Sequence, residues 1–431
     1  MKIKGLSFLD ESGLHHEAET FSLITKTAED IGKLPPGIVV IEADRSLRTV
    51  IRFLSSLHRG DIVFMLPPQE FRNTDFLEYF RQSAGPLHLW AMDEKSPVIS
   101  HEGNLSPKLQ GMKNVFLVKT SGTSGMKNKF VLHSTELFLQ KFSKRVPDFE
   151  RTINFFPPDS IAGIETLLEC MVHGKTLVNP WKEVEPSAVT NLLEKEKIDY
   201  LHVTPTFLNL MLLSGGLNSP HLKSVKMISF GSEPAQKNIL EKIKTLSPQT
   251  SFRQIYGMSE IGLLKTVSHT DDPAWFQLDE KVNPWRVKDG FLEVKSESPM
   301  ITYLNHDKEV VGGWFATGDA VQENGSLLKV VGRSDDVINV AGKKFHPIEL
   351  EELLMEMDGM DDVMVTSEPN ELIGNSVHVK VSSRMDEREF RMKLKVFLEE
   401  KVPAWMRPQR VIFDKSTDLS VRLKKRRKTS V

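Results

Sequence analysis

The chain has 431 residues, a length that suits two or three domains, and its 56 basic and 58 acidic side chains leave a net charge of −2. This balance argues against a protein that mainly coats nucleic acid, and no apolar run approaches the roughly 18 residues of a membrane-spanning helix. Cys170 is the only cysteine, which excludes intramolecular disulfides and cysteine-ligated metal clusters, so we expect a globular protein of the reducing cytoplasm.

The first part of the chain alternates strands and helices. The apolar run 38–41 predicts a strand, the stretch 47–54 a helix and residues 62–66 a second strand. Continuous apolar runs are typical of strands that are buried on both faces, so we expect a parallel sheet. An α/β core up to about Trp285 follows from the same alternation. Its further elements are an apolar segment over 161–172, strands at 176–178, 200–203 and 225–230, and a helix over 189–197.

Two further units are expected after this core. Residues 285–331 consist of short apolar runs separated by turns, which predicts a β-rich subdomain. A small α+β unit of about a hundred residues is expected beyond Asp335. Its expected elements are helices over 347–357 and 387–400 and strands near Val363 and Val377.

A loop rich in glycine and hydroxyl side chains follows the apolar strand 115–118. It reads Thr-Ser-Gly-Thr-Ser-Gly over 120–125. Glycines let several backbone N–H groups face one anion and hydroxyls add donors, so the loop is typical of a phosphate-binding segment. It is not a Walker A loop, because no Gly-Lys-Ser/Thr closes it. A flexible surface turn is the alternative interpretation.

Three later segments carry the residue types that a nucleotide site needs. Residues 256–260, Tyr-Gly-Met-Ser-Glu, offer a flat ring, a tight turn, a hydroxyl and a carboxylate suited to Mg²⁺. Asp319 follows a Thr-Gly turn and could accept hydrogen bonds from two ribose hydroxyls. Arg333 and Asp335 lie in a Gly-Arg-Ser-Asp segment. Each segment alone is more often a surface turn, and it is their order along one chain that favours a nucleotide site.

These motifs resemble those of the adenylate-forming enzymes, which include acyl- and aryl-CoA synthetases, stand-alone adenylation domains and firefly-type luciferases. Residues 120–125 are similar to the family's Thr-Ser-Gly-Thr-Thr-Gly loop, and 256–260 to its Tyr-Gly-x-Thr-Glu. Residues 317–319 match its Thr-Gly-Asp, and 332–335 match its hinge motif. The resemblance covers the chain from about Val39 to its end.

The resemblance implies an ATP- and Mg²⁺-dependent acid–thiol ligase. A small-molecule carboxylic acid would attack the α-phosphorus of ATP, giving an acyl-adenylate and pyrophosphate. A thiol of coenzyme A, or of the phosphopantetheine on an acyl carrier protein, would then take the acyl group. The implied fold is a large N-terminal domain of layered α/β sheets with a β-rich subdomain, over 1–332. A small mobile α+β domain, over 333–431, would rotate about a hinge near Asp335 between the two steps.

The resemblance also implies roles for single residues. Glu260 would hold Mg²⁺, Ser259 would bond the α-phosphate and Lys424 would be the catalytic lysine. Tyr256 would pack against adenine, and Gly342 would face the thiol tunnel. The phosphate contacts would be Thr120, Ser121, Gly122, Thr123, Ser124, Gly125 and Lys129. The remaining nucleoside contacts would be Gly231, Ser232, Glu233 and Gly257, with Asp319 and Arg333 on the ribose.

Two departures from the family pattern leave alternatives open. Where the family's loop ends in Pro-Lys-Gly, this chain has Lys127 and Lys129, and we favour Lys129 as the loop lysine. Near the C-terminus Lys424 and Arg427 match the family's lysine and arginine, but its proline and glycine are absent and Lys425 is a near rival. A disordered basic tail and a nucleic-acid patch are other interpretations of this run.

The acid itself is not specified by the sequence. Segments 155–163, 204–207 and 229–232 are expected to line its pocket, and aryl and aliphatic acids both stay open. Asp159 either meets a polar group of the substrate or caps the turn that follows Pro157 and Pro158. The histidines show no metal-ligand spacing, so no structural transition metal is expected. The alternative to an enzyme is a nucleotide-binding protein that kept the fold, lost turnover and acts as a partner or regulator.

Overall fold

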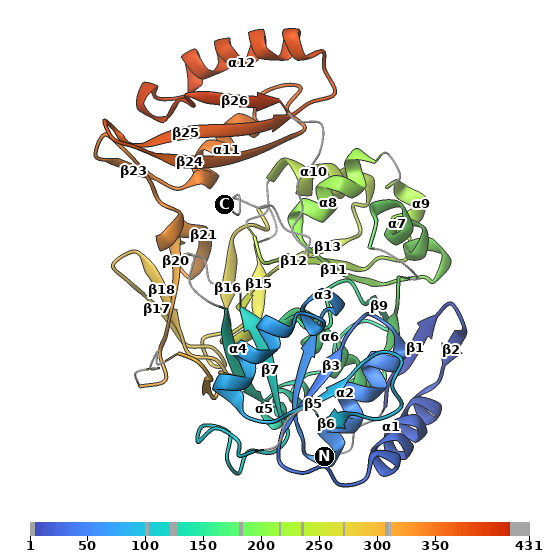
Figure 1. The fold of residues 1–431 in the computed structure, drawn as a ribbon. Coiled ribbons are helices and arrows are strands. Elements are labelled where there is room, and N and C mark those ends of the chain that lie inside the picture. The colour runs from blue at the N-terminus through green and yellow to red at the C-terminus, as the bar shows by residue number, and fades with distance from the viewer. Residues whose placement is uncertain are drawn as a thin grey trace.

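The protein is described by a computed structural model, which covers residues 5–99, 103–120, 128–180, 184–214, 217–233, 237–269, 272–306, 310 and 312–413. Strands in these ranges form four sheets. Figure 1 shows the C-terminal sheet at one end of the molecule and the N-terminal sheets stacked at the other. The α/β fold class expected from the sequence is confirmed.

One seven-stranded sheet is built on the predicted strand–helix–strand unit. β3 (Ile38–Glu42) and β4 (Ile62–Leu66) pair in parallel, and α2 (Leu47–Arg59) connects them. Every residue of both strands is buried, which explains why these runs are continuously apolar. The other strands are β5 (Leu87–Trp90), β6 (Val98–Ile99), β7 (Val115–Thr120), β8 (Lys129–Ser134) and β19 (Thr302–Tyr303). The accompanying helices are α3 (Pro68–Phe71), α4 (Thr74–Ala84) and α5 (Thr135–Ser143).

An eight-stranded sheet has the order β14-β13-β12-β11-β9-β10-β1-β2. Its strands are β1 (Ser7–Asp10), β2 (Gly13–His15), β9 (Arg151–Ile153), β10 (Thr176–Val178), β11 (Tyr200–Val203), β12 (Met227–Gly231), β13 (Ser251–Met258) and β14 (Gly262–Leu264). Its helices are α1 (Glu17–Ile31), α6 (Ile161–His173), α7 (Pro186–Lys195), α8 (Pro205–Leu213), α9 (Ser219–Leu222) and α10 (Lys237–Leu246). β12 begins two residues later than expected, because the Val225 amide donates to Leu222 O in a turn.

Helices fill the space between these two sheets. One hydrophobic cluster contains side chains of β3 and β4, of α2 and α6, and of β1 and β10. Cys170 on α6 is fully buried in this cluster, as expected for a small apolar side chain. A second cluster joins α7, α8 and α10 to the other face of the eight-stranded sheet. The carboxyl ends of β9, β11, β12 and β13 are thereby fixed next to one another.

The β-rich region is a six-stranded antiparallel sheet of order β15-β16-β21-β20-β18-β17. The sequence placed its start at Trp285, but the sheet already begins at Thr266, so that boundary was wrong. The two early strands are three residues long and form a hairpin, which is too short to produce a clear alternation. The strands are β15 (Thr266–Ser268), β16 (Phe276–Leu278), β17 (Trp285–Lys288), β18 (Phe291–Val294), β20 (Phe315–Asn324) and β21 (Leu327–Arg333).

Elements within residues 338–413 form the fourth sheet, which has its own apolar core. Its elements are β22 (Ile338–Val340), β23 (Lys343–Phe345), α11 (Pro347–Met355), β24 (Asp362–Asn370), β25 (Gly374–Ser382), α12 (Glu387–Lys401) and β26 (Arg410–Phe413). A single 3₁₀ turn, η1 (Ser334–Asp336), connects β21 to this unit. Polar contacts join the unit to the rest of the described chain. The Lys329 ammonium lies 2.8 Å from the Glu352 carboxylate, and the Asn209 amide donates to Asp361 O at 3.2 Å.

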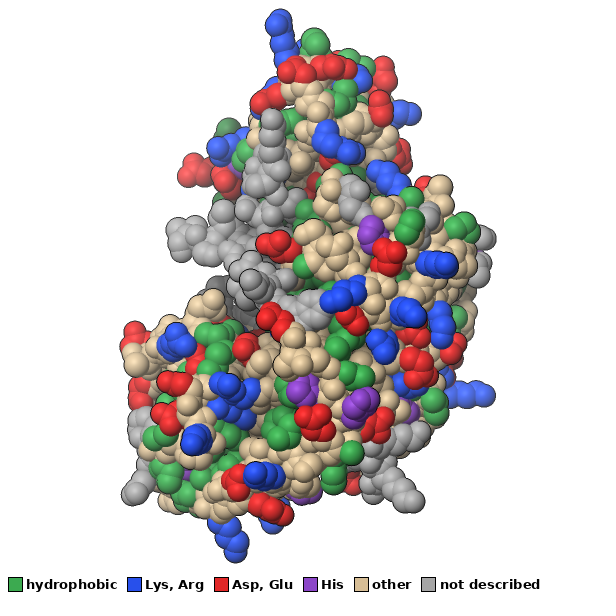
Figure 2. All heavy atoms as spheres, turned by 90° about the vertical axis from the view of Figure 1, so that its right-hand side faces the viewer, with side chains coloured by type: hydrophobic (Ala, Val, Ile, Leu, Met, Phe, Trp, Pro, Cys, Tyr) green, Lys and Arg blue, Asp and Glu red, His purple; other side chains and the backbone are tan. Residues whose placement is uncertain are grey.

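The surface carries no dominant charge on the face shown in Figure 2, where Lys and Arg side chains alternate with Asp and Glu. None of the helices in the described ranges has the length and apolar character to span a bilayer.

Burial of a histidine predicts how the stability of the fold depends on pH. His202 on β11 is 4% exposed and packs edge-on against Phe156, and burial lowers its pKa to about 4. The folded chain keeps it neutral while the unfolded chain protonates it below about pH 6.5. We therefore expect the free energy of unfolding to fall as the pH drops from 6.5 to 4, with His202 contributing up to about 1.4 kcal/mol per pH unit.

Urea unfolding at pH 7 and pH 5 measures this effect. His202→Gln should reduce the difference between the two pH values. An unchanged difference in His202→Gln would contradict the prediction.

Candidate active site

Ser259 and Glu260 lie in the tight turn between β13 and β14. The Ile261 amide donates to Met258 O at 3.2 Å and closes the turn. Gly257 is required beside it, because a Cβ at this position would lie 2.4 Å from Gly262 O on the opposite strand. The hairpin therefore presents the Ser259 and Glu260 side chains at the carboxyl end of β13.

The segment Gly231–Glu233 leaves the neighbouring strand beside this turn. β12 and β13 are parallel, and their register pairs Gly231 with Ile255. A Cβ on Gly231 would lie 2.6 Å from Ile255 O, and Ser232 has a φ of 76°, so the chain turns sharply here. Glu233 accepts a hydrogen bond from the Thr206 amide at 2.8 Å and thus binds the N-terminus of α8. This carboxylate has a structural partner that the sequence did not predict.

A buried hydrogen bond joins Tyr256 on β13 to Asp319 on β20. The Tyr256 hydroxyl donates to Asp319 Oδ2 at 2.7 Å, and the tyrosine is 6% exposed. Its ring stacks on Phe276 with centroids 5.7 Å apart. Burial and the Asp319 charge raise the pKa of Tyr256 well above its ordinary value. One face of the ring that was expected to meet adenine is therefore already covered.

Asp319 and Arg333 face each other across the β20–β21 pair. The register aligns them, and Arg333 Nε lies 3.4 Å from Asp319 Oδ1. Arg333 also donates to Thr317 O at 3.2 Å. Burial raises the pKa of Asp319, and the Arg333 charge and the Tyr256 hydrogen bond oppose this rise. The two residues expected to bind ribose thus lie together beside Tyr256.

Glu260 has a partner that sequence reasoning missed. The Tyr303 hydroxyl on β19 donates to Glu260 Oε1 at 2.9 Å, and burial together with the Glu260 charge raises the pKa of Tyr303. Lys129 Nζ lies 5.5 Å from the centroid of the Tyr303 ring. Lys129 pairs with Thr120 across the β7–β8 ladder. The strands that flank the predicted phosphate loop therefore lie close to the carboxylate predicted to hold Mg²⁺.

His133 is the second residue that the sequence analysis missed. Its Nε2 lies 2.6 Å from Ser259 O, although it is 126 positions away in sequence. The local sequence offers little reason to select either residue, because neither belongs to one of the motifs. His133 is one of three polar residues in β8, and Tyr303 follows Thr302 in a two-residue strand. A polar side chain at a buried strand position is the feature that could have indicated both.

The segments expected to line the acid pocket follow adjacent strands. Phe155 packs against Phe207 with centroids 4.7 Å apart. Asp159 is 8% exposed, and its charge raises the pKa of Arg45 against the stronger lowering by burial. The helix α6 is capped by Ser160, which accepts from the Gly163 amide at 3.1 Å. Asp159 thus lies near an arginine, and the cap of α6 is provided by Ser160.

Several predicted residues lie outside the described ranges. They are Ser121, Gly122, Thr123, Ser124 and Gly125 of the loop, together with Lys424 and Lys425. Asp335 lies in η1, and Gly342 lies in the exposed β22–β23 turn with a φ of 84°.

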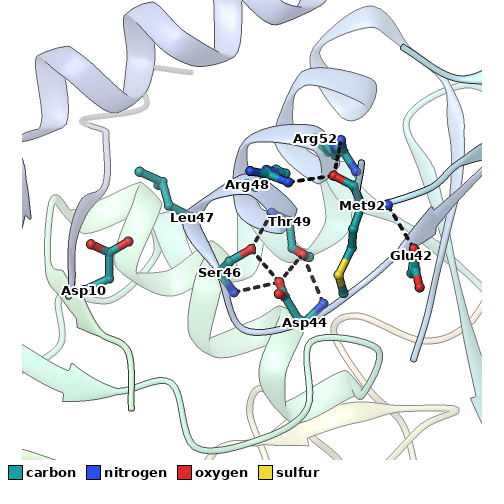
Figure 3. Close-up of a pocket in the computed structure, with 9 residues that line it drawn as sticks. All are labelled: Asp10, Glu42, Asp44, Ser46, Leu47, Arg48, Thr49, Arg52 and Met92. Atoms are coloured by element: carbon teal, nitrogen blue, oxygen red, sulfur yellow. Dashed lines mark hydrogen bonds between the residues drawn. The ribbon is translucent and has the colours of Figure 1, made fainter. Parts of the chain in front are cut away.

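A cavity of about 330 Å³ has none of the predicted site residues in its lining (Figure 3). It is lined by Asp10 of β1, by Glu42 and Asp44 at the end of β3, and by the first turns of α2. Asp44 accepts from the Ser46 hydroxyl at 2.5 Å and from the Thr49 hydroxyl at 2.8 Å. The Asp44 carboxylate is thus used to stabilise the start of α2.

The residues present suit Mg²⁺ with nucleotide rather than a metal held by protein alone. Within the described ranges no group of three or more His, Cys, Asp or Glu side chains could hold an ion. Mg²⁺ commonly binds one or two carboxylates and the phosphates of a substrate. A single carboxylate at the edge of the site, Glu260, fits that pattern.

Known proteins resemble the chain in sequence. Residues 46–282 match the model of the AMP-binding enzyme family. A putative long chain fatty acid-CoA ligase, VraA, of Staphylococcus epidermidis is 24% identical over 77% of this chain and 74% of its own length. A 2-succinylbenzoate–CoA ligase of Listeria monocytogenes is 24% identical over 78% of this chain and 74% of its own length.

Solved structures resemble the chain in fold. ATP-bound MatB from Rhodopseudomonas palustris matches with a TM-score of 0.80 and 17% identity, over 98% of this chain and 94% of that one. MenE, the O-succinylbenzoate coenzyme A synthetase of Bacillus subtilis, in complex with ATP and magnesium, matches with a TM-score of 0.73 and 18% identity. The match covers 98% of this chain and 95% of that one.

The Tyr256–Asp319 hydrogen bond predicts a measurable loss of stability. Tyr256→Phe removes a donor from a buried carboxylate, which should lower the free energy of unfolding by about 1.5–3 kcal/mol. Tyr200→Phe removes a neutral bond, since Ser229 Oγ donates to the Tyr200 hydroxyl at 2.7 Å, and should cost about 0.5–1.5 kcal/mol. Denaturant titration compares the two variants, and equal losses would argue against a charge-assisted bond.

Proposed function

The chain belongs to the AMP-binding enzyme family, and we propose that it is an ATP-dependent carboxylic acid ligase. It joins a carboxylate to the α-phosphorus of ATP, forming an acyl-adenylate and releasing pyrophosphate. It then transfers the acyl group to a thiol, and AMP leaves. The observation that carries the proposal is the convergence of Glu260, Asp319 and Lys129, from three different sheets, on one region.

Each of these residues suits one part of the nucleotide. Asp319 is buried and accepts hydrogen bonds, so it would bind ribose hydroxyls with Arg333 beside it. Glu260 would hold Mg²⁺, which when bound neutralises phosphate charge. The Ser259 hydroxyl would donate to the α-phosphate, and Lys129 would add a positive charge near the phosphates. We propose the same phosphate role for Thr120, Ser121, Gly122, Thr123, Ser124 and Gly125.

The nucleoside would lie between the carboxyl ends of β12 and β13. Gly231 and Gly257 allow the backbone to pack closely against the neighbouring strands there, because a Cβ at either position would collide with a carbonyl oxygen. Tyr256 would form one wall with the edge or the free face of its ring, because Phe276 covers the other face. Ser232 and Glu233 would form the opposite wall.

The second step would use movement of the C-terminal unit. We propose a large domain over 1–332 and a small one over 333–431, with Asp335 in η1 as the hinge. The Lys329–Glu352 pair crosses this hinge and would have to break on rotation. Gly342 lies in an exposed turn of the small domain and would then face the thiol tunnel.

Coenzyme A is the acceptor that we propose, because the relatives named above are CoA ligases. A carrier protein is the alternative. The acid would enter beside Phe155 and Phe207, whose rings favour an apolar acyl or aryl group. Asp159 lies near Arg45 and is therefore balanced in charge rather than available as an isolated anion.

Pyrophosphate exchange tests the proposed function directly. Labelled pyrophosphate should enter ATP only when a suitable acid is present, over a panel of aryl, aliphatic and amino acids. Glu260→Gln should lower the exchange rate by about 10²-fold or more. Glu293→Gln on β18, which removes the carboxylate paired with Arg286 on β17, should leave the rate unchanged. ATP binding without exchange for any acid would favour a nucleotide-binding protein that has lost turnover.

The C-terminal lysine is tested by two separate substitutions. If Lys424 bridges the carboxylate and the α-phosphate, Lys424→Ala should lower exchange by about 10²–10³-fold, and Lys425→Ala should have little effect. The reverse pattern would move the role to Lys425. Full exchange in both variants would contradict the proposed role of this segment.

A further inference from the structure

The backbone of the turn that carries Ser259 and Glu260 is held from outside its own hairpin. Ser259 O accepts from His133 Nε2 at 2.6 Å. Glu260 O accepts from the Met300 amide at 2.8 Å, and Ile261 O accepts from the Ser296 hydroxyl at 2.6 Å. Three consecutive carbonyls are thus fixed by groups that are distant in sequence.

The first of these groups is a buried, neutral histidine. His133 on β8 is fully buried, and its ring lies 5.3 Å from the rings of both Phe116 and Phe138. Burial, together with the Lys141 charge, lowers its pKa to about 4. Because a carbonyl can only accept, Nε2 must carry the proton and donate to Ser259 O. Nδ1 has no hydrogen-bond partner in the described part of the chain.

A buried ion pair holds the other end of the turn. Lys141 Nζ on α5 lies 2.5 Å from Glu165 Oε2 on α6 and donates to Leu263 O at 2.5 Å. Glu165 Oε1 in turn accepts from the Leu263 amide at 2.5 Å. The side chains are 1% and 3% exposed, so both charges are removed from water. The ion pair therefore holds both the N–H and the C=O group of Leu263.

We infer that His133, supported by the Lys141–Glu165 pair, is a positioning residue for the Ser259–Glu260 turn. Its hydrogen bond to Ser259 O fixes the backbone from which the proposed Mg²⁺ ligand and the proposed α-phosphate donor extend. This inference rests on the proposed function. Glu260 itself is oriented by Tyr303 alone among the contacts described, so the direction of its carboxylate depends on where the backbone lies.

Stability by itself gives no reason for this arrangement. Replacing a buried ion pair with well-packed apolar side chains is often neutral or stabilising. Apolar side chains cannot donate to Ser259 O or bind both polar groups of Leu263. The placement of these donors and acceptors along one turn therefore fixes the position of the turn. Loss of a group that supports a metal ligand typically lowers the affinity for the metal by about 10–100-fold.

His88 provides a matched control for His133. It lies on β5 of the same sheet, is 1% exposed, and its Nε2 donates a hydrogen bond to Pro35 O at 3.0 Å. Its Nδ1 also has no partner in the described ranges. Substitution of either histidine removes a buried donor from a backbone carbonyl, but only His133 bonds to the turn.

The test measures the Mg²⁺ concentration that gives half-maximal pyrophosphate exchange in His133→Leu, His133→Gln, His88→Leu and His88→Gln. His133→Leu should raise this concentration by about tenfold or more, and His133→Gln, whose amide can donate from a similar position, should restore most of the loss. Both leucine variants should lose stability in urea, and neither His88 variant should change the Mg²⁺ dependence.

Two results would overturn the inference: an unchanged Mg²⁺ dependence in His133→Leu, or the same shift in His88→Leu. If His133→Leu does not fold, His133→Asn, whose shorter side chain does not reach Ser259 O, is compared with His88→Asn instead. An unchanged Mg²⁺ dependence in His133→Asn then counts against positioning. Calorimetric titration of ATP at several Mg²⁺ concentrations applies the same comparison to binding alone. It tests the positioning role even if the unsubstituted protein catalyses no exchange, an outcome that would reject only the proposed function.

Discussion

The hydrogen bond between Tyr256 and Asp319 is the contact on which the arrangement of the site depends. It joins the eight-stranded sheet to the six-stranded antiparallel sheet between residues that are 63 positions apart. A buried carboxylate is costly unless it is paired, and Arg333 and Tyr256 together provide the compensation. Because the same carboxylate is the proposed ribose acceptor, the bond that unites the sheets also fixes the nucleoside position.

Much of the fold followed from the sequence because buried strands and amphipathic helices leave clear patterns. The unit β3-α2-β4 and the C-terminal helices α11 and α12 lie close to where those patterns predicted them. Strands of three residues, such as β15 and β16, leave no such pattern, since alternation over so few positions occurs by chance. The boundary of the antiparallel sheet was therefore placed too late in the chain.

For the site, the sequence indicated the residue types but not their partners. Motifs identified Glu260, Asp319 and Arg333, and the structure brings them together. The partners Tyr303 and His133 lie outside these motifs, in strands of two and six residues, and nothing in such short strands marks one polar side chain as a contact of a distant turn. Glu233 also shows this limit, because its bond to the N-terminus of α8 depends on packing between two strands and a helix.

The anchors of the Ser259–Glu260 turn also constrain the order in which the protein folds. His133, Lys141 and Glu165 meet this turn across separations of 126, 122 and 98 positions. Bringing such distant segments together lowers the conformational entropy of the chain before the contacts between them can compensate for that loss. The turn therefore acquires its final shape only after β8, α5 and α6 have docked. We therefore expect competence to bind nucleotide to be a late event in folding, which would report that both large sheets have assembled.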